Sequence, residues 1–236
     1  MEKNTDTNKK TQDGTTNYKD YLVDLIIYIS ALFLARQIYI PQIGYIASVI
    51  LGSLIAFSVA TWRMRVRGIK WKDLGLCKPK NFWITLLTAG LIIITVICFI
   101  IVFEIIKDNF PLNLREHKSS GVSRFGDLKG NIPLFLSIIL FVWVESMLEE
   151  LIDRGFMLNW FEKLLSFTSV RTILAVVIQA VLFGFRHSYD LSERSITVGM
   201  IGLVMGIAYV ISGRNLWALI IAHCILNSFS MLERVF

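Results

Sequence analysis

Charged residues and cysteines are scarce in this 236-residue chain. Only 18% of the residues are charged, 55% are hydrophobic, and the mean hydropathy is +0.61. An ordinary soluble domain carries about 25% charged residues, so this composition excludes a single soluble domain and indicates a membrane protein. The three cysteines, Cys77, Cys98 and Cys224, form no CxxC pair. They therefore predict neither a disulfide nor a cysteine metal site.

Several sequence patterns are missing as well. The chain has no internal repeat and no HExxH motif. No charged and apolar leader with a small-residue cleavage site precedes the first apolar segment, so we expect that segment to remain as an anchor. Residues 1–20 are polar and cannot bury enough surface to fold, which predicts a disordered cytoplasmic tail. Residues 21–236 are predicted to form one domain, with a motif-bearing core at about 132–232.

Long apolar stretches make up most of the chain. A helix needs about 20 apolar residues to cross ~30 Å of hydrocarbon, and no ten-residue alternation of the barrel type is present. We therefore predict an all-α, polytopic transmembrane helical bundle of about seven spans, at 21–39, 43–62, 82–106, 132–150, 169–186, 196–211 and 216–232. The run FMLNWFEKLLSF after Gly155 separates apolar from polar residues, which predicts one further, amphipathic helix in the cytoplasmic interface.

The net charge of +6 does not indicate a nucleic-acid partner, because topology accounts for the basic residues. Seven of them crowd the connection between the second and third apolar segments: Arg63, Arg65, Arg67, Lys70, Lys72, Lys78 and Lys80. The positive-inside tendency assigns this connection, and with it the N-terminus, to the cytoplasm. We therefore expect a multi-pass protein of the cell membrane. Its basic connection would also attract anionic lipid of the bilayer, at about 1 kcal/mol per residue.

Gly202 and Gly206 form a GxxxG pair in the sixth apolar segment. Such a pair lets a second helix approach closely. We expect this packing inside the monomer in preference to a dimer seam, and a homodimer stays open.

Two adjacent glutamates, Glu149 and Glu150, occur in an apolar segment. An ionisable group at membrane depth costs at least a few kcal/mol, so its default interpretation is functional. Adjacent helical residues point about 100° apart, whereas residues four apart share a face. Glu150 should therefore pair with Arg154, which leaves the Glu149 carboxylate free. Glu145 and Asp153 extend an acidic stripe on the Glu149 face, and we expect Asp153 to be solvated at the cytoplasmic end of this helix.

Two histidines lie on later apolar segments. His223 and Asn227 are four apart in the last segment and can both donate hydrogen bonds, as a developing oxyanion requires, although a lone histidine in an apolar helix is often a core residue. His187 directly follows the end of the fifth segment. Helical rise places Glu149 near the inner surface and His187 near the outer one. If they share a water, a helix must be tilted, broken or shifted in register, or the interfacial stretch must dip into the bilayer.

Three short motifs now stand in order on successive apolar segments. EELIDR (149–154) fits EExxxR, FGFRH (183–187) fits FxxxH, and HCILN (223–227) fits HxxxN. The chain in this respect resembles the CPBP family of intramembrane endopeptidases, which includes the CAAX prenyl-protein proteases and the bacterial Abi or bacteriocin-immunity proteins. The resemblance covers roughly residues 145–230.

The resemblance implies a glutamate-dependent peptidase without a cofactor, whose active site opens from the cytoplasmic side into a cavity within the bilayer. By motif, Glu149 with His187 would activate a water for attack on the scissile carbonyl. His223 and Asn227 would stabilise the tetrahedral oxyanion. The substrate would be a membrane-associated peptide or protein, and a prenylated carboxy terminus, a pheromone precursor and a bacteriocin receptor all suit such a cavity.

Glu150 and Arg154 match the family's supporting pair. The chain departs from the family at Asp153, where an aromatic or aliphatic residue is usual, and at Arg186, where small or apolar residues are common. These departures concern the substrate pocket and leave the core set unchanged.

Three other functions stay open. Glu149, His187 and His223 could instead bind zinc in a CAAX-type metalloprotease, although no HExxH pair supplies two ligands from one helix. A catalytically silent immunity or scaffold protein, or a proton-coupled transporter, would also carry intramembrane ionisable residues. The donor pair in the last segment and the lack of two-half symmetry favour a hydrolase over a transporter.

Overall fold

The computed structural model describes residues 18–110, 114–115, 126–190 and 192–236. The elements are α1 (Tyr18–Arg36), α2 (Gly44–Val66), the 3-10 helix η1 (Trp71–Leu74), α3 (Phe82–Asn109), α4 (Ile132–Glu150), the π-helix η2 (Leu151–Leu158), α5 (Asn159–Leu164), α6 (Arg171–Ser188), α7 (Glu193–Ile211) and α8 (Leu216–Leu232). Within these ranges the only β-type pairing is an isolated bridge between Arg115 and Ser192. The all-α prediction is confirmed.

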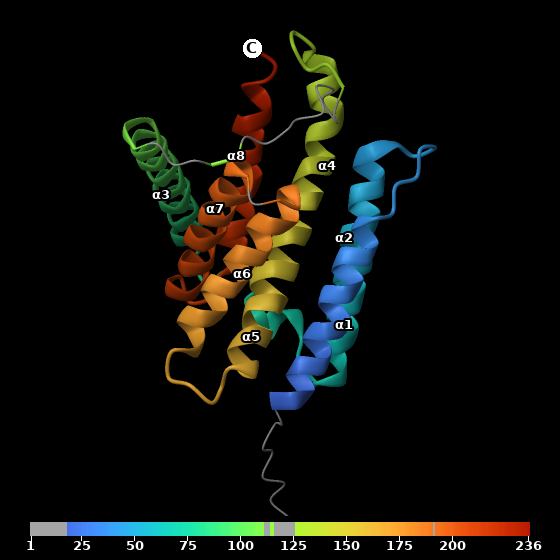
Figure 1. Ribbon diagram of the computed structural model, residues 1–236, viewed down its shortest axis with the longest axis vertical. Helices are drawn as coiled ribbons and strands as arrows, with labels where there is room; N and C mark the ends of the chain where they lie inside the picture. Colours follow the sequence, from blue (N-terminus) through green and yellow to red (C-terminus); the bar gives the residue numbers. More distant parts are fainter. Residues whose placement is uncertain (1–17, 111–113, 116–125, 191) are drawn as a thin grey trace, which may run out of the picture.

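The helices form rods that lie side by side (Figure 1). Four stretches are long and apolar enough to cross a membrane: Gly44–Val66, Phe82–Asn109, Ile132–Leu164 and Glu193–Ile211. The chain is thus a helical membrane protein, and the number of seven crossings stays a prediction. In Figure 1, α1 and α2 stand on one side, α3 on the other, and the motif-bearing rods between them.

The predicted boundary of the N-terminal tail needs a small correction. Residues 1–17 lie outside the described part of the chain, but residues 18–20 belong to α1. The Asp20 carboxylate forms an ion pair with the Arg67 guanidinium at 3.1 Å, which fixes the first turn of α1 against the end of α2.

The predicted interfacial helix after Gly155 is wrong. The fourth rod does not stop at Glu150 but continues through η2 and α5 to Leu164, and Phe156, Leu158 and Trp160 are fully buried. Tyr28 of α1 packs its ring 4.7 Å from that of Phe156.

The polar residues of this run face internal partners instead of solvent. The Asn159 amide donates to the Tyr209 hydroxyl at 3.0 Å, and Glu162 accepts from Arg214 at 2.6 Å. The alternation of polar and apolar residues therefore reflects a buried polar network, because buried polar groups need hydrogen-bond partners.

Glycines bring α6 and α7 together. A Cβ on Gly202 would lie 3.0 Å from the Phe183 ring, and one on Gly206 would lie 3.2 Å from Gln179. The closest approach is at Gly184, where a Cβ would lie 2.4 Å from the Ser195 carbonyl oxygen. The GxxxG face is thus occupied by α6 of the same chain, as expected, and a homodimer stays a prediction.

Gly184→Ala should therefore destabilise the protein. The added methyl collides with backbone atoms of α7, which cannot rotate away, and overpacking of this kind costs about 1–3 kcal/mol. Gly90→Ala in α3 is the matched control, since a Cβ there meets no atom within 4 Å. Thermal unfolding in detergent should show a lower midpoint for Gly184→Ala and an unchanged or higher one for Gly90→Ala. Equal midpoints would contradict the close α6–α7 contact.

Candidate active site

The length of the fourth rod brings Glu149 and His187 to one level. The stretch from Glu149 to Leu164 is nearly as long as the stretch from Arg171 to His187, which runs back after the chain has turned. At ~1.5 Å of rise per residue both side chains stand about 23 Å from the same end of the bundle. The sequence placed Glu149 and His187 at different depths in the membrane because the predicted span ended at residue 150, whereas the rod continues to Leu164.

His223 lies at the same level and is carried there by α8. Leu216, the first residue of α8, packs its side chain 3.3 Å from the position of a Cβ on Gly155. Glu149 lies about two helical turns before Gly155, and His223 lies about two turns after Leu216. α8 therefore starts beside the π-helix and carries its histidine up to the glutamates.

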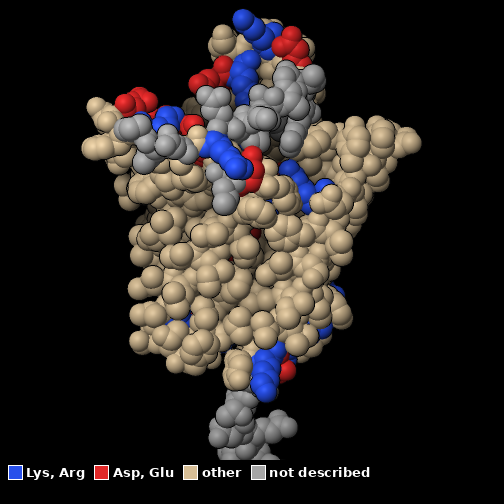
Figure 2. Space-filling model, viewed as in Figure 1, with Lys and Arg blue, Asp and Glu red and all other residues tan. Residues whose placement is uncertain are grey.

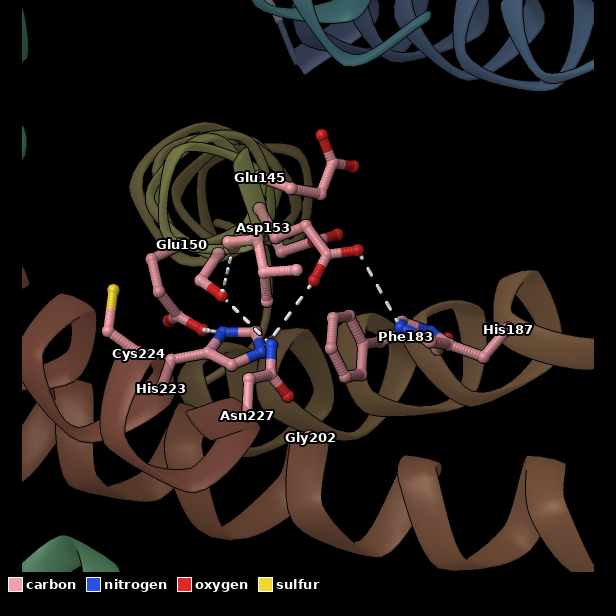
Figure 3. A network of polar contacts seen from close by, with 12 residues as sticks. Glu145, Glu150, Asp153, Phe183, His187, Gly202, His223, Cys224 and Asn227 are labelled. Atoms are coloured by element: carbon pink, nitrogen blue, oxygen red, sulfur yellow. Dashed lines mark hydrogen bonds and ion pairs between the residues drawn. The ribbon is translucent and has the colours of Figure 1, made fainter. Parts of the chain in front are cut away.

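The Glu149 carboxylate lies near two imidazoles, those of His187 and His223. In Figure 3 these two side chains project from two different helices. Glu149 Oε1 is 3.6 Å from His187 Nε2, and Glu149 Oε2 is 3.7 Å from His223 Nε2. Both distances exceed the roughly 2.7–3.2 Å of a direct hydrogen bond. They suit a water or a reacting group held between carboxylate and ring.

Hydrogen bonds at Nδ1 orient both rings. His187 Nδ1 is 2.7 Å from the Phe183 carbonyl oxygen, which can only accept, so this nitrogen donates. In the neutral ring, His187 Nε2 then holds a lone pair that faces Glu149. His223 Nδ1 is 2.7 Å from Glu150 Oε1 and donates to it.

Glu150 has two partners. Its Oε1 accepts from Arg154 Nη1 at 2.8 Å as well as from His223, and the side chains of Glu150 and Arg154 are fully buried. The ion pair expected from the i, i+4 spacing is therefore present. Sequence reasoning missed the contact with His223, which joins residues 73 apart and orients that ring as a buried carboxylate does in a catalytic triad.

Asp153 and Arg186, the two departures from the family pattern, contact each other. Arg186 Nη2 is 2.6 Å from Asp153 Oδ2 and 3.4 Å from Glu149 Oε1. Asp153 is fully buried, so its predicted solvation is wrong. The reason is the continued fourth rod, which places Asp153 in the interior and not at a helix end. Arg186 supplies the cation that a buried carboxylate requires.

Asn227 shares a helix face with His223, and Glu145 shares one with Glu149. The Asn227 amide donates to Ser146 Oγ at 2.9 Å, which leaves one N–H of its amide group for another acceptor. Glu145 accepts from Ser53 of α2 at 2.5 Å and shows no contact to either imidazole among the described residues. No local pattern could signal the Ser53 contact, since it joins residues 92 apart.

Cavities adjoin Glu149 on two sides. One of about 1100 Å³ is lined at its inner end by Glu149, His187, His223 and Asn227, and its walls include apolar residues such as Val96, Ile100, Phe141, Ile201 and Met205. A smaller one of about 100 Å³, between α1, α2 and α4, shares Glu149 and His187 with it. The larger cavity has room for ligands well beyond the size of a few waters.

The predicted alternative ligands of zinc do not form a ready site. Across the described ranges, no group of three or more His, Cys, Asp or Glu side chains is arranged to hold a metal ion. One imidazole nitrogen of each ring faces Glu149, whereas the other nitrogen contacts a carbonyl or a carboxylate of the protein.

These features define a class: a helical membrane protein with a carboxylate between two imidazoles at the end of an interior cavity. Residues 131–229, less than half of the chain, match the family described as Rce1-like, Type II CAAX prenyl endopeptidase. The match runs from the start of α4 into α8 and contains all three motifs, so the family resemblance is confirmed. No curated protein and no solved structure matches the chain.

Proposed function

We propose that this protein is an intramembrane endopeptidase that hydrolyses a peptide bond of a membrane-associated peptide or protein. One observation carries the proposal: the Glu149 carboxylate lies 3.6 Å and 3.7 Å from two imidazole nitrogens, at the end of a cavity large enough for an extended peptide. The family match adds that related chains are endopeptidases.

Glu149 and His187 act together on the nucleophile. A water between Glu149 Oε1 and His187 Nε2 can donate one hydrogen to each, since both are acceptors in the orientation described above. Glu149 takes a proton from this water as the oxygen attacks the scissile carbonyl carbon. The same proton is then available for the leaving amine, so that water adds across the C–N bond.

His223 and Asn227 act on the carbonyl oxygen. Because His223 Nδ1 already donates to Glu150, its Nε2 can donate to an oxyanion only when the ring is an imidazolium. Such a cation would face the Glu150 carboxylate through Nδ1. Asn227 adds its remaining amide N–H, and donors placed in this way stabilise the charge that develops in the transition state.

Cleavage should not depend on a metal ion. The described residues offer no ready ligand set. Glu149 can activate the attacking water as a base, which is the task that zinc would perform in a metalloprotease. Purified protein should cleave equally well before and after dialysis against a chelator, with metal content measured by mass spectrometry on the same samples. Loss of cleavage with the chelator and recovery with zinc would favour the metalloprotease.

In vivo, the proposal is tested by substrate trapping. Membranes from cells that carry wild-type protein or Glu149→Gln are solubilised, and the peptides that co-purify are identified by mass spectrometry. A peptidase predicts an intact species that is enriched with the variant and shortened with the wild type. A silent immunity protein or a transporter predicts the same species, uncut, with both.

The orientation is part of the same proposal. We infer a multi-pass protein of the cell membrane with a cytoplasmic N-terminus, because seven Lys and Arg residues lie between positions 63 and 80.

A further inference from the structure

Three charged side chains meet inside the bundle, although its surface between the two ends carries almost no charge. On the face drawn in Figure 2, most Lys, Arg, Asp and Glu residues gather toward the two ends, and the broad band between them is nearly uncharged. In the interior, the side chains of Glu149, Asp153 and Arg186 are only 13%, 0% and 9% exposed. Water cannot solvate charges at such sites, so each charge requires a partner of opposite sign. The two acids therefore share one cation.

Arg186 bridges the two acids. Glu149 is the second-last residue of α4, and Asp153 lies in η2, about one turn further along the same rod. Arg186 Nη2 is 2.6 Å from Asp153 Oδ2 and 3.4 Å from Glu149 Oε1. The first distance is that of a direct, charge-assisted hydrogen bond, whereas the second is that of a longer ion pair. Asp153 thus anchors the guanidinium, and the guanidinium in turn faces the carboxylate of Glu149.

The neighbouring acid shows what such a contact can do. Arg154 holds Glu150, and Glu150 orients the ring of His223. Glu149 makes no direct hydrogen bond to either imidazole, because both distances are too long. Among the described residues, the side-chain nitrogen of Arg, Lys or His that lies nearest to the Glu149 carboxylate is Arg186 Nη2. Arg186 is therefore the group placed to fix Glu149.

Arg186 contacts Glu149 from outside the large cavity. It lines only the smaller cavity, whereas Glu149 and His187 line both. Arg186 directly precedes His187 in α6, and the backbone of α6 is fixed against α7 where Gly184 meets the backbone of Ser195. The guanidinium is thus held beside the carboxylate without occupying the space in which a peptide would bind.

We propose that Arg186 is a positioning residue for Glu149: its guanidinium, anchored by Asp153, balances the charge of the Glu149 carboxylate and holds it facing His187. A carboxylate that acts as a base carries a negative charge, and in the interior that charge needs a cation beside it. Asp153 and Arg186, the two departures from the family pattern, then act as one unit. That Glu149 is the base rests on the proposed function, whereas the hold of Arg186 on Glu149 does not.

A double-mutant cycle tests this hold without any need for cleavage. Asp153→Asn/Arg186→Gln removes the guanidinium together with its anchor, so neither charge of that pair is left alone. Asp153→Leu/Arg186→Met, with apolar residues at both positions, provides a second such background. Glu149→Gln is introduced into the wild type and into each background, and thermal unfolding in detergent is measured for every protein.

We expect Glu149→Gln to raise the unfolding midpoint more in the two backgrounds than in the wild type. In the backgrounds it removes a buried carboxylate that has lost its nearest cation, whereas in the wild type it also removes an ion pair. A difference between the two effects is the coupling between the side chains. Equal effects, or a larger rise in the wild type, would overturn the proposal.

Cleavage separates positioning from a purely structural role. In both backgrounds kcat should fall by about 10–100-fold, since a small displacement of a catalytic group can cost about 10²-fold. KM should stay unchanged, because Arg186 does not line the large cavity. Arg186→Lys keeps the positive charge and should retain more activity than either background. The matched control is Glu162→Gln/Arg214→Gln, which removes a 2.6 Å ion pair that lines neither cavity and should leave kcat as in the wild type.

The possible failures are distinguishable. Full activity of both backgrounds beside an active wild type would show that Arg186 serves Asp153 alone, and would overturn the proposal. A higher KM with an unchanged kcat would also overturn it, because Arg186 would then act on substrate binding. A wild type that cleaves no peptide would contradict the proposed function, whereas the unfolding cycle would still decide whether Arg186 holds Glu149.

Discussion

Glu149→Gln is expected to lower peptide cleavage by about 10²–10⁴-fold, the range that general-base catalysis contributes. Glutamine keeps the size of the side chain and can still hydrogen-bond a water between itself and His187. It cannot take the proton of that water, because an amide is not a base at neutral pH. The rate constant kcat should therefore fall while KM changes little. The measurement is cleavage of the trapped substrate in proteoliposomes.

Glu145→Gln is the matched control for this substitution. It lies one helical turn earlier, also removes a negative charge from the interior, and is held by Ser53 instead of an imidazole. Most of the activity should remain. Comparable losses in the two variants would show that charge in the cavity matters and that Glu149 has no special role. Full turnover by Glu149→Gln would refute the assignment of the base.

The helices were predictable because their apolar stretches are long, but the continuation of the fourth rod was not. Four charges within Glu149–Arg154 look like the polar end of a span, since such groups are costly in lipid. In the structure three of these four charges are neutralised in pairs, Glu150 by Arg154 and Asp153 by Arg186. The second pair joins residues 33 apart, so a local pattern could not reveal it.

The motif spacing indicated which side chains share a helix face, and the structure brings Glu149, His187 and His223 together. Contacts between helices were beyond such reasoning. The contact between Glu150 and His223 is one example. Another is Asp24, which is fully buried and accepts from Arg63, Arg67 and Trp160. A usable signal was present for Asp24, because an acid in an apolar segment without a basic residue nearby on its own helix requires a partner elsewhere.

Arg154→Met is expected to destabilise the protein by about 3–5 kcal/mol, the usual cost of leaving one member of a buried ion pair alone. Arg154 and Glu150 are both fully buried, and the lost guanidinium also contacts the Gly202 carbonyl. The carboxylate would keep His223 as its single hydrogen-bonding partner among the described residues. Thermal unfolding in detergent should show a much lower midpoint and a smaller folded yield.

The double variant Glu150→Gln/Arg154→Met separates stability from catalysis. Removing both charges of a buried pair is often close to neutral, so the unfolding midpoint should recover most of its loss. Cleavage should not recover, because a neutral amide can accept from His223 Nδ1 but offers no negative charge to face an imidazolium. A double variant that melted as low as Arg154→Met would show that the guanidinium acts through packing, for which its position 4.4 Å above the Phe183 ring gives a basis. Recovery of both stability and cleavage would show that the negative charge of Glu150 is not needed beside His223.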